Sequence, residues 1–228
     1  IVKHGNRGSH KSNGSFDLLE ALCVPFDLSL EEKAKQFQER NLCFLFARAH
    51  HPAVKAVGPA RAKLGRRTIF NLVGPLCNPA EVKSQVLGVS DALLGPKMAE
   101  VLCRLNRGPS VVVHGAPGID EFSLSGTSKA WWVRDGEITE KSYEAKDFGL
   151  SEVSWDDLPK GDAKENSKIF MEIIAGGGNL GLRAMVALNA AAGIVLMKEH
   201  LDLKTAFKQV MDHMESGAVL PYFESLLS

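Results

Sequence analysis

A strand, a helix and a second strand follow one another in the middle of the chain, and this order restricts the fold strongly. Residues 84–89 form a β-branched run and residues 110–113 an apolar run, both typical of buried strands, while residues 96–105 between them have helical spacing. Two strands joined by a crossover helix lie parallel in one sheet. The sequence therefore predicts an α/β fold.

Helical patterns precede this unit. Residues 16–22 read as a short helix after a polar loop. Ser29 and Glu32 form a capping-box pattern, in which each side chain accepts a hydrogen bond from the other's backbone N–H, so we expect a helix over residues 30–40. Residues 42–64 are also helix-rich but contain two prolines, which predicts two or three short helices there.

A hairpin and further helices are expected after the central unit. Asp135-Gly136 lies between two strand-like runs, and this dipeptide suits the positive φ angles of a tight hairpin turn. We therefore expect an antiparallel hairpin over residues 130–143. Three helices are expected over residues 162–174, 182–200 and 203–216.

Composition excludes several classes of protein. The 228 residues carry 27 Lys plus Arg against 27 Asp plus Glu, and 45% are hydrophobic, which argues against disorder and against electrostatic capture of nucleic acid by the whole chain. The four cysteines form no C-x-x-C pair, so we expect a reducing, cytoplasmic location and no zinc finger. The apolar stretch 182–197 contains Arg183 and Asn189, and we expect no membrane span.

The chain begins at Ile1 without the basic start and long apolar middle of a secretory signal. We expect it to be part of a longer polypeptide.

The first candidate site is Lys3-His4-Gly5-Asn6-Arg7, where a strand runs into a glycine-bearing loop. At the carboxyl edge of a parallel sheet, such a loop offers backbone N–H groups and a lysine to phosphate oxygens. The spacing does not match the G-x-x-x-x-G-K-[ST] phosphate loop, and the segment taken alone is better explained as a polar surface turn.

Two further candidates carry charged side chains. Asp120 and Glu121 follow a buried strand on an irregular loop, and an adjacent carboxylate pair can clamp magnesium together with substrate phosphates, although such pairs also occur as solvated charge. Arg61, with His51 upstream, could form a fork onto a substrate carboxylate. Taken singly, His51 and Arg61 also suit a structural role.

These motifs together resemble the anthranilate phosphoribosyltransferase family across essentially the whole chain. The matching segments are Lys3-His4-Gly5-Asn6-Arg7, residues 14–22, His51-Pro52-Ala53, residues 67–79, residues 85–89, residues 114–121 and Leu188-Asn189-Ala190-Ala191-Ala192. The combination of Lys-His-Gly-Asn-Arg with the long Arg-Thr-Ile-Phe-Asn block is specific to this family.

The resemblance implies a nucleoside phosphorylase/phosphoribosyltransferase-type α/β domain with a central, mostly parallel sheet, and remnant helices of a small α-helical domain. On this pattern residues 1–28 begin the α/β domain, residues 29–65 belong to the helical domain and residues 66–228 complete the α/β domain. The resemblance also implies a homodimer.

The activity implied by the resemblance is transfer of the phosphoribosyl group of phosphoribosyl pyrophosphate to the amine of anthranilate, with Mg²⁺ bound to the phosphates. The residues that match phosphoribosyl pyrophosphate contacts are Lys3, Gly5 and Asn6. Those that match the anthranilate channel are His4, Asn6, His51, Arg61, Gly74 and Pro75. Asp120 and Glu121 match the magnesium carboxylates, and Arg61 is the expected partner of the substrate carboxylate.

Two departures from the family pattern bear on this interpretation. The family's glycine-rich phosphate loop and most of its helical domain precede Lys-His-Gly-Asn-Arg, so we expect residues 1–228 alone to be inactive. His10 and Lys11 replace small residues of the family loop. The alternatives are a pyrimidine nucleoside phosphorylase-like enzyme and a non-catalytic paralogue that binds nucleic acid or a partner.

Overall fold

The structure is a computed structural model that describes residues 1–7, 14–52, 56–57, 60, 63–64 and 68–227. The chain divides into two compact units. The first unit comprises Ile1–Val82, Lys160–Lys168 and Pro221–Ser228, and the second comprises Lys83–Pro159 and Ile169–Leu220. Each unit is described separately below.

The first unit is built on two parallel strands, β1 (Val2–Gly5) and β2 (Cys43–Phe46), which pair with His4 opposite Leu45. Within the described residues, the helices of this unit include α1 (Ser15–Ala21), α2 (Leu30–Arg40), α3 (Ala47–His50) and α6 (Ile69–Val73), and the 3-10 turn η1 (Gly74–Leu76) follows α6. The helices predicted over residues 16–22 and 30–40 are confirmed. In α2 the Ser29–Glu32 capping box forms as expected.

The strand β2 corrects one expectation, because the sequence analysis placed residues 42–64 in short helices. The tetrapeptide Cys-Phe-Leu-Phe is a short apolar run, and periodicity alone cannot distinguish a buried strand from a buried helix at this length. Pairing with β1 decides for the strand, since it satisfies the backbone groups of both segments. After β2, α3 is a short helix that ends at His50, and helical positions also occur among the described residues at 52, 56, 60 and 63–64, so the expectation of short helices holds for this part of the segment.

Aromatic packing holds the β1–β2 pair against α1. The Phe16 ring is completely buried and lies 5.1 Å from the Phe26 ring and 5.3 Å from the Phe46 ring. A Cβ atom placed on Gly5 would come within 3.1 Å of the Phe16 ring, so the end of β1 packs closely on this cluster.

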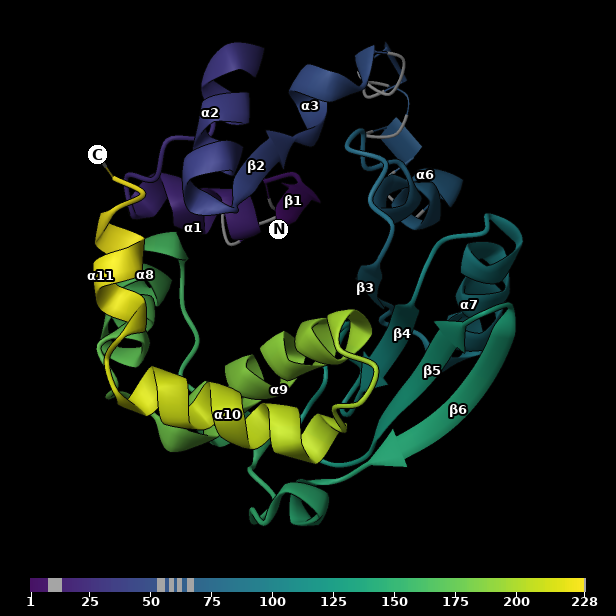
Figure 1. Cartoon of the computed structure of the whole chain (residues 1–228), viewed down its shortest axis with the longest axis vertical. Helices are drawn as coiled ribbons and strands as arrows, with labels where there is room; N and C mark the ends of the chain where they lie inside the picture. Colours follow the sequence, from purple (N-terminus) through teal and green to yellow (C-terminus); the bar gives the residue numbers. More distant parts are fainter. Residues whose placement is uncertain (8–13, 53–55, 58–59, 61–62, 65–67, 228) are drawn as a thin grey trace. The chain divides into compact units, whose positions relative to one another are not determined.

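The second unit contains a four-stranded sheet in the order β3-β4-β5-β6 (Figure 1). Strands β3 (Gln85–Gly88) and β4 (Ser110–Gly115) are parallel and joined through η2 (Ala92–Leu94) and α7 (Gly95–Arg104). Strands β5 (Ser128–Arg134) and β6 (Glu137–Tyr143) form the hairpin. The β-α-β unit and the hairpin are both confirmed.

The α/β class is confirmed, and the pairing within the larger sheet is mixed. β5 adds antiparallel to β4, and β6 adds antiparallel to β5. The sheet of the second unit is therefore less parallel than expected, because the predicted hairpin joins the β-α-β unit in one sheet instead of standing apart from it.

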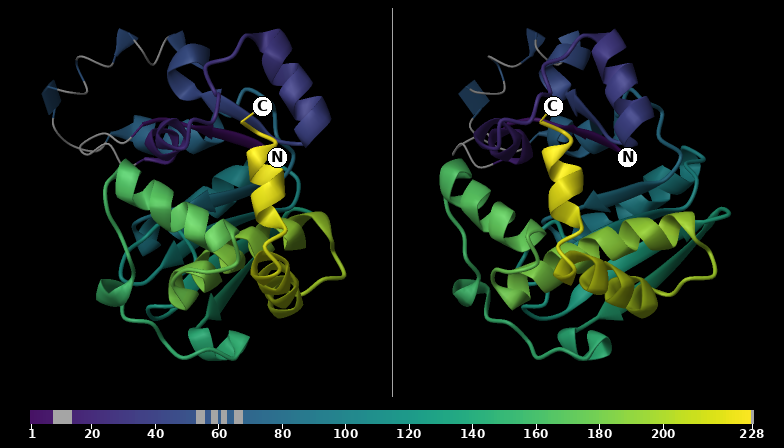
Figure 2. Two further views of the ribbon diagram at one scale, coloured as in Figure 1. Left: turned by 90° about the vertical axis from the view of Figure 1, so that its left-hand side faces the viewer. Right: turned by 60° about the vertical axis from the view of Figure 1, so that its left-hand side comes forward.

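The predicted carboxyl-terminal helices are present as α8 (Ala163–Ile174), α9 (Leu180–Met197) and α10 (Leu203–Glu215), and they are followed by α11 (Val219–Glu224), which the sequence analysis did not anticipate. Two more 3-10 turns, η3 (Ala145–Phe148) and η4 (Trp155–Asp157), follow the hairpin. Both views of Figure 2 show α9 and α10 side by side, in agreement with their extensive contact.

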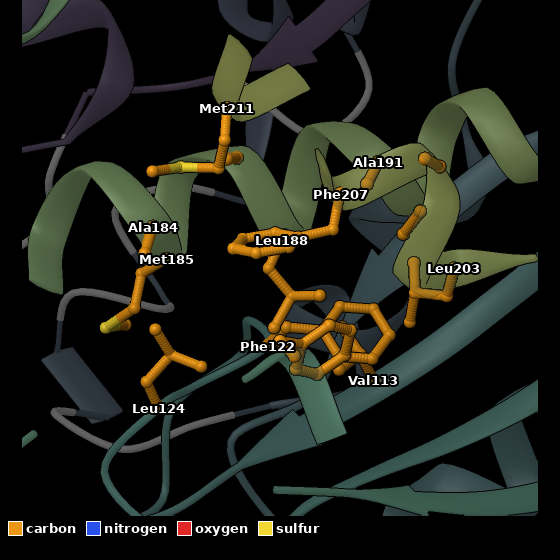
Figure 3. Close-up of a cluster of buried hydrophobic side chains, with 14 of the residues drawn as sticks. Val113, Phe122, Leu124, Ala184, Met185, Leu188, Ala191, Leu203, Phe207 and Met211 are labelled. Carbon is orange, nitrogen blue, oxygen red and sulfur yellow. The ribbon is translucent and has the colours of Figure 1, made fainter. Parts of the chain in front are cut away.

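The hydrophobic core of the second unit lies between the sheet and α9 and α10 (Figure 3). Val113 of β4, Leu188 of α9 and Phe207 of α10 all belong to this buried cluster. α9 contributes mainly small side chains, including Ala184 and Ala191, which are completely buried and let the neighbouring elements approach closely.

The helix α9 has 18 residues and a mean hydropathy of 1.8, which is long and apolar enough to cross a membrane by length and composition. The core helix of a globular protein passes the same test, and α9 supplies residues to the core just described. The absence of a membrane span stays a prediction.

The predicted domain limits also stay predictions. The compact units join residues 1–82 in one body, whereas the resemblance assigns residues 29–65 to a separate helical domain. Within the first unit, the β1–β2 pairing links these two parts of the chain directly.

Candidate functional site

The carboxyl ends of β1 and β2 bring two of the predicted segments together. Parallel strands end at the same edge of a sheet, so Asn6, which follows β1, lies at the same edge as the start of α3. α3 then leads to His51. This edge of the first unit is called the histidine edge below.

His4 and His51 meet at the histidine edge. Their Nε2 atoms are 3.0 Å apart, so one imidazole donates and the other accepts a hydrogen bond, and the two rings are edge-to-face. Burial in the first place, and then the neighbouring His51, His50 and Lys3, together lower the pKa of His4 from 6.5 to about 4. His4 is therefore neutral at pH 7.

Lys3 and Asn6 are exposed beside this pair. The backbone N–H of Arg7 donates to Asn6 Oδ1 at 3.0 Å, and the Arg7 guanidinium donates to Glu20 at 2.9 Å and lies 5.4 Å from the centre of the Phe46 ring. Arg7 thus ties the end of β1 to α1 and β2. The sequence analysis assigned it no role, although its place in Lys-His-Gly-Asn-Arg was a signal.

The Gly74-Pro75 turn forms η1 directly after α6, and η1 contacts β1. The Asn78 side chain donates from Nδ2 to the Val2 carbonyl at 3.3 Å, which attaches the segment after the turn to the same strand that carries His4. Arg61 lies outside the described residues, so its predicted place in this group stays a prediction.

Asp120 and Glu121 lie in the second unit, on the loop after β4, and both are exposed. The loop packs its backbone against the carboxyl ends of both parallel strands. A Cβ atom on Gly88 would lie 1.7 Å from the Asp120 carbonyl oxygen, and one on Gly115 would lie 2.3 Å from the Glu121 carbonyl oxygen. Only glycine fits at either strand end. The loop that follows β4 and carries Asp120 and Glu121 is called the carboxylate loop below.

Hydrogen bonds hold the carboxylate loop at both ends. Gly115 and Ile119 form an isolated antiparallel bridge, with N–H···O distances of 3.0 and 2.8 Å. Beyond Glu121, the backbone N–H and C=O of Phe122 both bond to the side chain of Asn189 on α9. Asn189 had no role in the sequence analysis, where the only signal was its position in Leu-Asn-Ala-Ala-Ala.

The donor set of the carboxylate loop fits magnesium. Among the described residues, no group of three or more His, Cys, Asp or Glu side chains could form an all-protein metal site. Mg²⁺ needs only one or two carboxylates when substrate phosphates and water complete its octahedron. Two adjacent exposed carboxylates on a firmly held backbone meet that need.

The predicted residues therefore fall into two groups, each within one unit. Lys3, His4, Gly5, Asn6, His51, Gly74 and Pro75 lie in the first unit, and Asp120 and Glu121 lie in the second. The first group offers two imidazole rings, an exposed lysine and an amide, and the second offers carboxylate oxygens.

The chain matches the model of the glycosyl transferase family, α/β domain, over residues 1–220. It is 40% identical over 220 residues to the anthranilate phosphoribosyltransferase of Idiomarina loihiensis and 39% identical over 230 residues to that of a Roseiflexus species. These alignments cover 96% and 100% of this chain. The chain spans 65% and 67% of the length of these two relatives.

Solved structures of anthranilate phosphoribosyltransferases match the chain as well. The crystal structure of anthranilate phosphoribosyltransferase from Thermus thermophilus matches with a TM-score of 0.91 and 36% identity, over 99% of this chain and 67% of that chain. The enzyme from Saccharomyces cerevisiae in complex with PRPP and Mg matches with a TM-score of 0.89 and 27% identity, over 100% of this chain and 64% of that chain.

Proposed function

The chain belongs to the anthranilate phosphoribosyltransferase family, and from this premise we propose that its complete gene product transfers the phosphoribosyl group of phosphoribosyl pyrophosphate to the amine of anthranilate, a step of tryptophan synthesis. The observation that carries this proposal is 36–40% identity to relatives of that name over nearly all of this chain. The alignment includes every residue of the two groups described above.

The reaction exchanges one bond at C1 of the ribose. The bond from C1 to the pyrophosphate oxygen breaks, a bond from C1 to the anthranilate nitrogen forms, and the amine loses a proton. Positive charge develops on the ribose and negative charge on the leaving pyrophosphate, so positioning and electrostatic stabilisation can supply most of the acceleration.

The histidine edge suits the aromatic substrate. The neutral imidazole of His4 and the ring of His51 beside it present flat surfaces with hydrogen-bonding nitrogens, which suit a ring that carries an amine. The Gly74-Pro75 turn contacts β1, the strand that carries His4, and in this proposal it lines the same anthranilate site. Arg61 provides the guanidinium that pairs with the anthranilate carboxylate.

Lys3, Gly5, Asn6 and the carboxylate loop suit the phosphorylated substrate. Lys3 is exposed within β1 and can neutralise a phosphate oxygen, while the Asn6 amide can donate to another. Asp120 and Glu121 would hold Mg²⁺, which, when bound, neutralises the charge that builds on pyrophosphate. In this assignment the carboxylates take up the metal only together with the phosphorylated ligand.

The proposal extends to the setting of the enzyme. We propose a cytoplasmic homodimer without membrane attachment, supported by the family resemblance and by the unpaired cysteines of the described residues.

Anthranilate fluorescence tests the proposed function. The complete gene product, incubated with phosphoribosyl pyrophosphate, Mg²⁺ and anthranilate, should remove the fluorescence and release one pyrophosphate for each anthranilate consumed. Omission of Mg²⁺ should stop both changes. Phosphorolysis of a pyrimidine nucleoside without anthranilate turnover would replace the proposal with the nucleoside phosphorylase alternative.

A further inference from the structure

The side-chain amide of Asn189 forms a two-way hydrogen-bonded pair with the backbone of Phe122. The Phe122 N–H donates to Asn189 Oδ1 at 2.9 Å, and Asn189 Nδ2 donates to the Phe122 carbonyl at 3.0 Å. We propose that Asn189 is a positioning residue, which sets the carboxylate loop so that Asp120 and Glu121 can bind Mg²⁺ together with a pyrophosphate-bearing ligand. The inference rests on the proposed function.

The contacts allow only one orientation of the Asn189 amide. Nδ2 also donates to the Met185 carbonyl one helical turn earlier at 2.9 Å, so both of its hydrogens are used. Rotation of the amide by 180° would face Nδ2 toward the Phe122 N–H and Oδ1 toward two carbonyls. α9 therefore holds the amide, and the amide holds the loop.

The loop transmits this restraint over a single residue. Phe122 is completely buried and directly follows Glu121, so a shift of its backbone moves Glu121. The Gly115–Ile119 bridge holds the other end of the loop, and Gly88 packs against Asp120. The carboxylates remain exposed while the backbone that carries them is fixed from three directions.

The chain contains a matched control for this contact. Asn166 forms the same two-way pair with the backbone of Gly161, at 3.0 Å for each hydrogen bond. Both asparagine side chains are partly buried, but the Gly161 loop carries none of the proposed site residues. Replacing either asparagine removes such a two-way pair, with the Asn189–Met185 bond lost in addition in the first case, and the comparison separates a local effect on the site from a general loss of stability.

Asn189→Leu and Asn166→Leu should be compared in the complete gene product. Leucine branches at the same carbon as asparagine, is somewhat larger, and can form neither hydrogen bond. With saturating phosphoribosyl pyrophosphate, Mn²⁺ binding followed by electron paramagnetic resonance should weaken about tenfold in Asn189→Leu, as for residues that support metal ligands, and should not change in Asn166→Leu. The Mg²⁺ concentration for half-maximal rate should rise by the same factor, with the anthranilate KM unchanged.

Hydrogen exchange reports on the contact independently of activity. In Asn189→Leu the Phe122 amide should exchange faster, while the Val111–Val113 amides of β4 keep their protection. If those strand amides also lose protection, the variant has not kept its fold. Asn189→Ser then replaces it in the same comparison. Serine is too short to bridge to Phe122 and is small enough not to overfill the site.

Faster exchange at Phe122 with unchanged Mn²⁺ binding would overturn the inference, since Asn189 would then only pack the loop. Equal weakening in both leucine variants would also overturn it, as an effect of general stability. A wild-type protein that does not convert anthranilate contradicts the proposed function instead; Mn²⁺ binding with phosphoribosyl pyrophosphate would still decide the role of Asn189.

Discussion

The histidine edge and the carboxylate loop both lie at the carboxyl ends of a parallel strand pair, yet they are built differently. At the histidine edge, side chains act on one another: His4 and His51 share a hydrogen bond, and burial keeps His4 neutral. In the carboxylate loop, the side chains of Asp120 and Glu121 are exposed, and glycines and Asn189 hold the backbone beneath them.

This difference indicates how each region can be changed. The properties of the histidine edge depend on desolvation and on neighbouring charge, so they should respond to pH and to side-chain replacement. The properties of the carboxylate loop depend on the position of its backbone, so they should respond to any atom added where Gly88 or Gly115 packs against that backbone. Four predictions follow this comparison from the largest expected effect to the smallest.

Removal of both carboxylates should have the largest effect. In the complete gene product, Asp120→Asn with Glu121→Gln should lower Mg²⁺-dependent turnover about 1,000-fold, because the charge that forms on pyrophosphate loses its stabilisation. Steady-state rates across a Mg²⁺ titration measure this. The matched control is Asp156→Asn with Asp157→Asn, another exposed adjacent pair, which should keep its activity. Unchanged turnover of the first variant at saturating Mg²⁺ would remove Asp120 and Glu121 from the site.

Gly88→Ala should break the support of the loop. The new Cβ atom would overlap the Asp120 carbonyl oxygen, so the backbone must move, at a cost of about 3 kcal/mol or more in the free energy of unfolding. Denaturant titration measures the loss. Gly193→Ala on α9 is the control, because among the described residues no heavy atom beyond the adjacent backbone of the helix lies within 4 Å of its added Cβ, and helix propensity favours alanine by roughly 0.5–1 kcal/mol. Equal stability of the two variants would refute the close approach.

Arg61→Ala should affect one substrate only. A forked, charge-assisted hydrogen bond is worth roughly 1.5–3 kcal/mol, so the anthranilate KM should rise about 10- to 100-fold while the KM for phosphoribosyl pyrophosphate stays the same. Steady-state kinetics in both substrates measure the split. Arg61→Lys should rescue poorly, because a point charge cannot reproduce the fork. Equal rises in both KM values would place Arg61 outside the aromatic-acid site.

His4→Gln should change the pH dependence of stability. The folded-state pKa of about 4 lies below the ordinary value of 6.5, so the unfolded chain binds more protons between these values, and stability falls as pH falls from 6.5 towards 4. After allowance for partial exposure, this loss is about 1–2 kcal/mol. Denaturant titrations at pH 7 and pH 4 measure this loss, and in His4→Gln the free energy of unfolding should fall by about 1–2 kcal/mol less between these two pH values than in the wild type. Parallel curves for the two proteins would mean that His4 is not desolvated.

Local patterns predicted the elements whose signals lie within a few neighbouring residues. The Ser29–Glu32 capping box, the Asp135-Gly136 turn and the β-α-β unit all formed as expected. β2 was missed because four apolar residues carry no period, and only its distant partner β1 decides between strand and helix.

The candidate site shows the same limit. Motif resemblance proposed His4, His51, Asp120 and Glu121 as site residues, because those residue types recur in fixed local order, and their roles stay predictions. It did not indicate that His4 contacts His51 or that Asn189 holds Phe122, since these contacts join segments 47 and 67 residues apart in the chain. Such pairs follow from tertiary packing and not from any local pattern.

The position of the metal tests the central claim most directly. Crystals of the complete gene product, grown with Mn²⁺ in place of Mg²⁺ and with phosphoribosyl pyrophosphate, should give an anomalous scattering peak within coordination distance of the Asp120 and Glu121 carboxylates, about 2.0–2.2 Å from the ligand oxygens. The peak should disappear in the Asp120→Asn, Glu121→Gln variant. A metal peak on the phosphates that neither carboxylate contacts, either directly or through a bridging water, would contradict the account.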